Sequence, residues 1–327
     1  MHVDVVIPTY NRADLLGRTL ESLAVARIPD GFSASVIVVD NNSKDDTRAV
    51  IEAFAPRFGG RLRYVFEARP GRSHALNAGI AIANRDLVGM IDDDEEVDAG
   101  WYEEIARAFA DPTLDFITGP YLPRWGAQAP AWLPQRPSSV VGWVDGGPEV
   151  RTFGRDYDGV LMGGNAVVRL ARLREVGGYD PALGRSSDGR LLSCEDEEMQ
   201  QRLVRAGAHG EYRPALVIYH YIPPERLTRR YHRRWFFWHG VSAGVLDRTS
   251  RARVPYLFGV PRHRIGRLAR ASVWFVPGLV GVGPLATRTA RFDARMDALD
   301  LAGFWYGKFR FRPDAPVTSP ARVGVSR

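Results

Sequence analysis

Five consecutive acidic residues follow directly on a short apolar segment, and this junction constrains the fold more than any other part of the chain. Residues 87–91 have the length and composition of a buried β-strand, and the acidic residues 92–96 continue it without an intervening turn. Adjacent carboxylates repel one another, and hard cations such as Mg²⁺ prefer carboxylate and phosphate oxygens. Ligand sites in open α/β sheets lie at the carboxyl ends of strands. The junction therefore predicts a cation and phosphate site rather than only a solvated acidic loop.

Strand-like and helix-like segments alternate through the first 91 residues. Short apolar or β-branched runs predict strands, and these lie at 3–7, 35–40, 62–66 and 87–91. Apolar residues at helical spacing predict helices, and these lie at 12–26, 47–58 and from Ser73 to about residue 84. Such alternation is typical of βαβ units in a parallel sheet. All four strands would end at one edge, which would bring together Thr9, Asp40, the loop of Arg72 and residues 92–94.

The middle of the chain continues this pattern around one long irregular segment. Helices are predicted at 101–110, 170–176 and 194–206, and strands at 114–118, 160–168 and 214–220. Residues 120–158 are rich in Pro and Trp, and a long loop of this kind is expected to contact the sheet or a substrate. Gly163 and Gly164 interrupt a strand pattern, which indicates a close approach of backbone or ligand. A helix rich in Arg and aromatic residues is predicted at 226–239.

The composition fits a globular protein with one strongly basic segment. The 327 residues are 45% hydrophobic and 25% charged, which is ordinary for a folded domain. The net charge is +6, and residues 225–270 contain twelve Arg against two acids, Glu225 and Asp247. Cys194 is the sole cysteine, so no disulfide forms within the chain, which fits a reducing compartment. No histidine in a recognisable context adjoins Cys194 in the sequence, so the thiol is assigned no role.

No segment has the pattern of a membrane-spanning helix or a cleavable leader. The longest apolar window, 271–286, spans about 16 residues and is interrupted by two Pro-Gly pairs, whereas a spanning helix needs roughly 20 apolar residues. The N-terminus enters a strand without a charged region or a cleavage site. We therefore expect a cytoplasmic protein, with peripheral contact at the inner face of the cell membrane as a further hypothesis.

Five segments in chain order resemble the motifs of the family 2 inverting glycosyltransferases, which have the GT-A fold. The matching segments are 5–12 (opening strand and turn), 38–47 (second nucleotide loop), 77–79 with 91–94 (the approach to a DxD motif), 163–165 with 177–180 (acceptor side) and 195–196 with 202–203 (ED-motif helix). The matches run from residue 3 to about residue 240, and the C-terminal part carries no motif of this family.

The resemblance implies an α/β fold of the GT-A type, in which a mostly parallel sheet is flanked by helices. It implies a Rossmann-like nucleotide-sugar-binding half at 1–118, an acceptor-binding and catalytic half at 119–240, and a C-terminal helical extension at 241–327 that is a candidate for membrane association. It further implies sugar transfer, with inversion, from a UDP-, GDP- or dTDP-sugar to a saccharide or lipid-linked acceptor. It implies a hexosyltransferase-like enzyme of polysaccharide or cell-envelope biosynthesis.

Such a transfer needs a cation at the leaving diphosphate and a base for the acceptor hydroxyl. By the resemblance, Asp92 and Asp94 would bind Mg²⁺ or Mn²⁺, and which Asp touches the ion stays open. His220 would be a third metal ligand, with a purely structural histidine as the alternative. Asp196 would be the general base. The alternative is that Asp196 only caps its helix while Glu195 performs the chemistry or binds the acceptor.

The remaining site residues are assigned to the two substrates or to the following helix. The expected nucleotide contacts are Pro8, Thr9, Tyr10, Arg12, Asp40, Arg72, Asn77, Asp92 and Asp93. The expected acceptor contacts are Gly164 and Asn165. The acids Glu95, Glu96 and Asp98 are expected to cap or solvate the next helix rather than face the cation.

Two other classes of function are weighed against this one. A nucleotidyltransferase also combines an α/β nucleotide fold with acidic metal ligands, but the chain has no Gly-rich phosphate loop followed by Lys. A non-enzymatic basic module for membranes or nucleic acid would leave the acidic run unexplained, because that run repels phosphate backbones. No nucleic-acid partner is therefore expected. The Arg and aromatic residues of 229–238 either meet lipid headgroups or cover the catalytic core.

Overall fold

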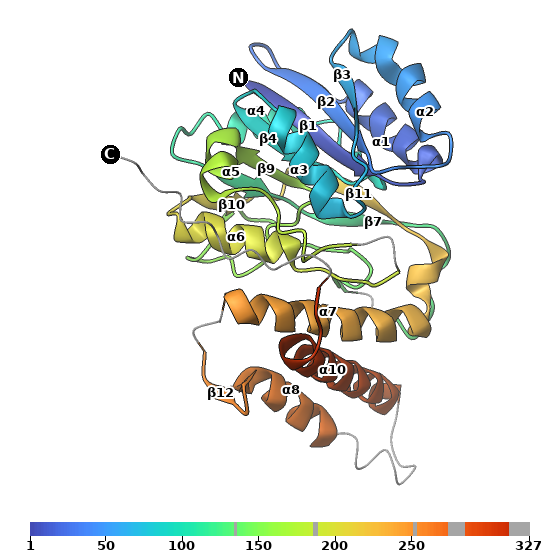
Figure 1. The fold of residues 1–327 in the computed structure, drawn as a ribbon, viewed down its shortest axis with the longest axis vertical. Helices are drawn as coiled ribbons and strands as arrows, with labels where there is room; N and C mark the ends of the chain where they lie inside the picture. The colour runs from blue at the N-terminus through green and yellow to red at the C-terminus, as the bar shows by residue number, and fades with distance from the viewer. Residues whose placement is uncertain (134–135, 186–188, 251–253, 274–284, 314–327) are drawn as a thin grey trace.

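The computed structural model describes residues 1–133, 136–185, 189–250, 254–273 and 285–313. Over these ranges the chain forms a sheet with helices packed against it, and beyond them lies a layer of three further helices (Figure 1). Within the described ranges, no helix is long and apolar enough to cross a membrane. Most of the apolar window at 271–286 lies outside the described residues.

The main sheet has eight strands in the order β3-β2-β1-β4-β9-β6-β10-β8. The strands are β1 His2–Thr9, β2 Ser33–Asp40, β3 Leu62–Phe66, β4 Leu87–Met90, β6 Phe116–Thr118, β8 Arg151–Thr152, β9 Ala166–Arg169 and β10 Gly210–Tyr212. Strands β1 to β4 are parallel, whereas β9 runs antiparallel to both of its neighbours. The first four strands confirm the predicted βαβ order. β1, β2 and β4 are buried almost throughout, which explains why they are continuous apolar runs.

Helices cover both faces of this sheet. The helices against the sheet are α1 Ala13–Val25, α2 Thr47–Phe54, α3 Arg72–Ile82, α4 Trp101–Ala108, α5 Leu170–Val176 and α6 Glu195–Arg205, with a 3₁₀ turn η1 at Ala55–Phe58. Neighbouring residues of β1 point to opposite faces, so Val5 packs in the core beneath α1 and α4, while Val6 packs in the core beneath α3, α5 and α6. The mostly parallel, helix-flanked sheet that the resemblance implies is confirmed.

A second, three-stranded sheet was not predicted and shapes the site. Its order is β5-β11-β7, formed by Glu95–Val97, Ile218–Ile222 and Tyr121–Trp125. The strand predicted at 214–220 therefore begins later, and part of the segment 120–158 is regular rather than irregular. The strand predicted at 160–168 is also shorter, because residues 163 and 164 lie in a turn before β9. The antiparallel pairing of β5 and β11 sets Glu95 directly opposite His220.

The C-terminal layer consists of α7 Arg229–Thr249, α8 Arg262–Val273 and α10 Leu285–Phe309, preceded by the 3₁₀ turn η2 Pro224–Leu227 and a two-stranded sheet of β12 Tyr256–Leu257 and β13 Val260–Pro261 (Figure 1). α7 and α10 pack backbone to backbone. A Cβ atom on Gly240 would overlap the carbonyl oxygen of Asp300, and one on Gly303 would overlap that of Phe237. Because α7 runs unbroken past residue 240, we move the proposed start of the helical extension to Arg229.

Candidate active site

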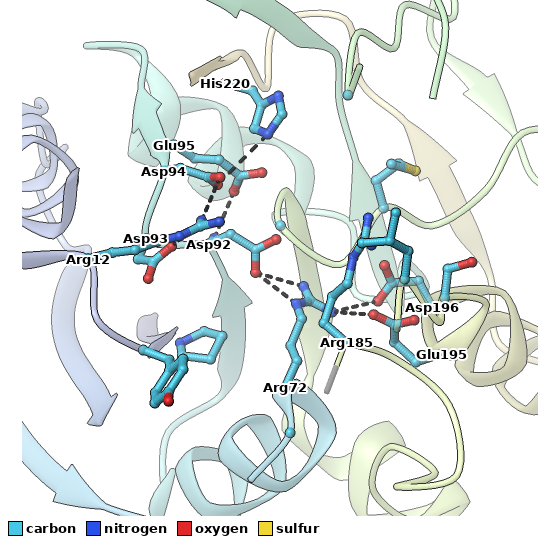
Figure 2. A pocket seen from close by; sticks show the side chains of 18 of the residues that line it. Arg12, Arg72, Asp92, Asp93, Asp94, Glu95, Arg185, Glu195, Asp196 and His220 are labelled. Carbon is cyan, nitrogen blue, oxygen red and sulfur yellow. Dashed lines mark hydrogen bonds and ion pairs between the residues drawn. The ribbon is translucent and has the colours of Figure 1, made fainter. Parts of the chain in front are cut away.

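A cleft of about 820 Å³ opens at the carboxyl ends of β1 and β4. Its lining combines Thr9 at the end of β1, Arg72 at the start of α3, the acidic run after β4, and the N-terminal turn of α6. Figure 2 shows the charged side chains of these separate segments turned toward one another. The sheet edge predicted from the alternation of strands and helices is therefore the wall of a single cleft.

Three carboxylates of the acidic run form a cluster of oxygen ligands. One oxygen from each of Asp92, Asp94 and Glu95 lies within 4.8 Å of the other two. Burial raises the pKa of Glu95 well above its usual range, and the charges of Asp92 and Asp94 raise it further. A cation at this point would relieve that repulsion, and an all-oxygen ligand set suits Mg²⁺ or Mn²⁺. The residues present therefore fit a hard divalent ion.

Glu95 was expected to cap or solvate the next helix, and this expectation is wrong. Its side chain is 1% exposed, and one of its oxygens accepts a hydrogen bond of 2.8 Å from the backbone N–H of Asp92. Pairing of β5 with β11 pulls Glu95 inward beside His220. Asp98 lies as expected, because it accepts a hydrogen bond from the N–H of Gly100 at the start of α4. Glu96 lies away from the cluster as expected, but it pairs with Arg124 at 3.3 Å rather than with the helix.

Asp93 and Asp94 lie side by side, and the pKa values of their carboxyl groups shift in opposite directions. Burial raises the pKa of Asp93 to about 7, although Arg12 and a hydrogen bond from the Thr9 hydroxyl oppose the shift. Burial also works against ionisation of Asp94, but the neighbouring His220, Arg12 and Arg226 hold its pKa at about 2. Arg12 joins the pair, with Nη1 lying 3.0 Å from Asp93 Oδ1 and 2.7 Å from Asp94 Oδ2. Of this pair, Asp94 is therefore the carboxylate whose ionised form its neighbours favour.

His220 lies beside this cluster as a neutral ring. Burial lowers its pKa to about 4. Its Nε2 atom lies 3.8 Å from Asp94 Oδ1 and 2.9 Å from Arg226 Nη1. Because a guanidinium only donates, Nε2 accepts this hydrogen bond and the proton resides on Nδ1. His220 thus presents an unprotonated nitrogen toward Asp94, and Arg226 would have to move before that nitrogen could bind a metal.

Arg72 connects the two sides of the cleft. Its guanidinium contacts Asp92 at 2.9 Å, Glu195 at 3.2 Å and Asp196 at 3.3 Å (Figure 2). Arg72 was expected to contact the nucleotide of the donor. In this structure the guanidinium of Arg72 instead forms ion pairs with one carboxylate of the acidic run and with two carboxylates of α6. Arg72 therefore sets the separation between the candidate metal ligands and the candidate base.

Asp196 and Glu195 begin α6 and face the cleft. Burial raises the pKa of Asp196, Asp92 adds to the shift, and Arg72 opposes it. Burial and the charge of Asp196 raise the pKa of Glu195 to about 7. Gly163 makes room for this arrangement, because a Cβ atom there would overlap the Asp196 carboxylate. Gly164 likewise makes room for Glu95, so the close approach predicted for these two glycines involves carboxylates of the protein itself.

If Asp196 is the general base that the family resemblance implies, sugar transfer should decline on the acid side at a higher pH than an ordinary aspartate base would give. A base acts only when deprotonated, and the raised pKa of Asp196 means that protonation begins earlier as the pH falls. Arg72 opposes that rise, so Arg72→Gln should move the acid limb of the profile of kcat/KM to still higher pH. An acid limb that stays in place, or moves to lower pH, in Arg72→Gln would contradict this assignment.

Three of the predicted ligand contacts do not line the cleft: Asn165, Asn77 and Asp40. The Asn165 side chain is fully buried, and its amide bonds to Trp101 Nε1 at 3.0 Å and to the carbonyl of Leu216 at 2.7 Å. The Asn77 side chain donates a hydrogen bond from Nδ2 to the carbonyl of Tyr179 and accepts one at Oδ1 from the N–H of Tyr179. These two amides, expected at the acceptor and the nucleotide, instead hold the framework of the site.

Asp40 also uses its carboxylate within the protein. It accepts hydrogen bonds from the N–H of Ser43 at 2.8 Å and from the hydroxyl of Tyr64 at 3.0 Å. The asparagines that follow it, Asn41 and Asn42, line the cleft. The loop after β2 therefore reaches the cleft as predicted, but the acid at the end of the strand shapes the loop. The other predicted contacts that line the cleft are Pro8, Thr9, Tyr10, Arg12, Arg72, Asp92, Asp93, Asp94, Gly164, Glu195, Asp196 and His220.

Several residues of the cleft were not assigned from the sequence. Arg226 lies in the basic segment that the charge count singled out, yet nothing local distinguished it from its neighbours. Arg185 lines the cleft between Arg72 and α6, and its buried Nη1 has no hydrogen-bond partner within the described ranges. Trp235 and His239 reach the cleft from α7, where their rings stack at 4.8 Å. Trp235 thus covers the cleft, as one of the two alternatives expects, whereas Phe237 and Trp238 pack in the C-terminal helical layer.

Comparison with known proteins places this cleft among sugar-transferring enzymes. The family model described as glycosyl transferase family 2 matches residues 4–175. The succinoglycan biosynthesis protein ExoM of Rhizobium meliloti is 29% identical over 300 residues, covering 90% of this chain and 89% of ExoM. The glucosyl-dolichyl phosphate glucuronosyltransferase of Haloferax volcanii is 28% identical over 252 residues, covering 76% and 78% of the two chains.

Solved structures share the fold at low sequence identity. The mannosyltransferase PcManGT from Pyrobaculum calidifontis, solved with GDP-Man and Mn²⁺, superimposes with a TM-score of 0.62 at 18% identity, over 94% of this chain and 87% of PcManGT. S. aureus TarS 1–349 in complex with UDP superimposes with a TM-score of 0.53 at 16% identity, over 95% and 93% of the two chains. The fold of these enzymes, which is of the GT-A type, extends over nearly the whole chain.

Proposed function

This chain belongs to glycosyl transferase family 2, and on that premise we propose that it is an inverting, metal-assisted hexosyltransferase that moves a sugar from a nucleotide-sugar donor to an acceptor hydroxyl. The observation that carries the proposal is the bridge made by Arg72, which holds the oxygen cluster after β4 and the Asp196 carboxylate in one cleft. A cation site and a base on facing sides of one cavity are what such a displacement requires.

The donor would bind at the carboxyl ends of β1, β2 and β4. Asp92, Asp94 and Glu95 would hold Mg²⁺ or Mn²⁺, with His220 as a further ligand once Arg226 has moved. The bound ion would offset the negative charge that develops on the leaving diphosphate. Thr9, Tyr10, Arg12 and Asp93 would contact the nucleotide, by the family resemblance and their position on the cleft wall.

Asp196 would accept the proton of the acceptor hydroxyl. As that oxygen bonds to the anomeric carbon of the sugar, the bond to the diphosphate breaks and the nucleoside diphosphate leaves with the electron pair. Attack from the face opposite the leaving group inverts the anomeric centre. Arg72 would stabilise the ionised form of Asp196 before the transfer, because its guanidinium lies 3.3 Å from Asp196 Oδ1.

We further propose a lipid-linked acceptor that carries a phosphate. The name of the Haloferax relative includes a dolichyl phosphate. In this chain, Arg185 supports an anionic acceptor, because it lines the cleft and its buried Nη1 has no hydrogen-bond partner in the described ranges. The exposed arginines of α7, among them Arg230 and Arg233, would hold the protein at the inner face of the cell membrane.

Binding to anionic vesicles is expected to depend on Arg230 and Arg233. Both side chains are exposed at the N-terminal half of α7. An arginine near an anionic lipid surface contributes about 1 kcal/mol, so Arg230→Gln with Arg233→Gln should weaken binding by about 30-fold. Cosedimentation with vesicles containing phosphatidylserine measures the effect, and neutral vesicles are the control. Equal binding of the double variant and the unaltered protein to anionic vesicles would refute the contact.

The test of the main proposal is nucleotide release from a panel of UDP-, GDP- and dTDP-sugars. The protein is incubated with each donor and a lipid-linked saccharide, with Mn²⁺ or Mg²⁺ and with a chelator in place of the metal. We expect metal-dependent release of one nucleoside diphosphate and formation of a product with inverted anomeric configuration. If no donor binds or turns over in the presence of either metal, the proposal fails.

A further inference from the structure

A second cluster of metal-ligating side chains lies on the acceptor side of the cleft. Cys194, Glu197 and His239 each present one ligand atom within 4.8 Å of the other two. All three residues line the cleft. The cluster shares no residue with the carboxylates after β4, and it adds a thiol and an imidazole to a single carboxylate. A thiol, an imidazole and a carboxylate together suit a borderline ion such as Zn²⁺ rather than Mg²⁺.

The three ligands come from two elements that are far apart in the sequence. Cys194 immediately precedes α6, and its backbone takes a left-handed conformation with φ of 72°, unusual for a residue other than glycine. Glu197 lies in the first turn of α6 and has no hydrogen-bond or ion-pair partner within the described ranges. His239 reaches the cluster from α7 of the C-terminal layer. The chain thus converges on this point from the catalytic body and from the helical extension.

His239 is held in the way that metal-bound histidines are held. Its Nδ1 lies 3.0 Å from Oδ1 of Asp300, a carboxylate that is 2% exposed. Arg264 and Arg267 contact the other oxygen of Asp300, so the carboxylate keeps its charge and position. With Nδ1 donating to Asp300, Nε2 is left as the unprotonated nitrogen. A carboxylate on the far nitrogen is the usual partner that orients a histidine ligand and increases its basicity.

We propose that Cys194, Glu197 and His239 bind Zn²⁺. Three protein ligands leave a fourth position, which faces the cleft because all three residues line it. The ion would fasten α7 to the first turn of α6, and Asp196 lies in that same turn. Zn²⁺ at this point would therefore position the helix that carries the candidate base, as a site distinct from the donor cation site.

The test uses untagged, full-length, metal-free protein and Co²⁺ as a spectroscopic substitute for Zn²⁺. Because Cys194 is the sole cysteine, a thiolate-to-Co²⁺ charge-transfer band in the near ultraviolet reports only this residue. We expect the band to saturate at one equivalent and to disappear when one equivalent of Zn²⁺ is added. Cys194→Ser and His239→Gln should abolish it, and Asp300→Asn should weaken Co²⁺ affinity by about 10- to 100-fold.

Asp94→Asn is the matched control, because it alters the donor cation site and should leave the band intact. Circular dichroism and thermal unfolding establish that each variant is folded. A folded protein that gives no charge-transfer band would overturn the proposal, as would a band that persists unchanged in His239→Gln. If Cys194→Ser does not fold, protection of Cys194 in the unaltered protein against a thiol reagent decides the matter, because equal labelling with and without Zn²⁺ refutes the site.

Discussion

Replacing Asp196 by Asn is expected to lower kcat for sugar transfer by about 10²- to 10⁴-fold, the range usual for loss of a general base. Asn has nearly the same shape but cannot take up the proton of the acceptor hydroxyl. Donor affinity should change little, because Asp196 belongs to α6 rather than to the oxygen cluster after β4. Steady-state transfer and equilibrium donor binding, measured on the same preparation, separate the two effects.

The controls for Asp196→Asn distinguish loss of a base from loss of a charge. Asp46→Asn makes the same exchange at an exposed residue whose side chain caps no helix, and it should retain full activity. Glu195→Gln tests the alternative base, since Glu195 contacts the same guanidinium of Arg72. Near-normal turnover by Asp196→Asn, together with a large loss in Glu195→Gln, would reassign the base to Glu195.

The wall of the cleft could be predicted from the sequence because each of its parts is a local signal. An apolar run followed by acids marks a strand end wherever it occurs, and alternation with helices places several such ends at one edge. Thr9, Arg72 and the acidic run were therefore placed together correctly. The parallel pairing of β1 to β4 followed from the same alternation, which is typical of βαβ units.

The wrong predictions concern residues whose side-chain positions are set by contacts between distant parts of the sequence. Glu95 is one acid among five in the sequence, and only the pairing of β5 with β11 turns it inward to face His220. Asn77 and Asn165 carry the polar groups that a ligand site needs, but both side-chain amides form hydrogen bonds with backbone carbonyls of the protein. No sequence pattern distinguishes an amide that binds substrate from one that satisfies a buried carbonyl.

The two metal-ligand clusters differ in how far apart their ligands lie in the sequence, and only the cluster of nearly consecutive residues could be predicted. Asp92, Asp94 and Glu95 are nearly consecutive, so the sequence alone suggested a cation there. Cys194 precedes α6 and His239 lies in α7, and neither has a neighbour in the sequence that marks it as a ligand. The close packing of α7 on α10 through Gly240 and Gly303 is what brings Asp300 behind His239. The partner that orients His239 therefore exists only in the folded chain.

Replacing Asp94 by Asn is expected to lower kcat/KM for the donor by about 10²- to 10³-fold, the usual effect of removing one group that stabilises developing charge. Asp94 is the carboxylate of the run whose pKa is held at about 2, so it is ionised throughout the neutral range. It also belongs to the oxygen cluster with Asp92 and Glu95. An amide removes the charge and keeps the shape, so donor binding should no longer strengthen when Mn²⁺ or Mg²⁺ is added.

Glu96→Gln provides the matched control within the same acidic run. Glu96 pairs with Arg124 and belongs to neither the cleft lining nor the oxygen cluster, so its neutralisation should leave the metal dependence of donor binding unchanged. Titration of donor affinity against Mn²⁺ compares the two variants directly. If Asp94→Asn kept its metal dependence while Asp93→Asn lost it, the ion would belong to Asp93, and the ionisation state set by Arg12 and Arg226 would not decide which aspartate binds it.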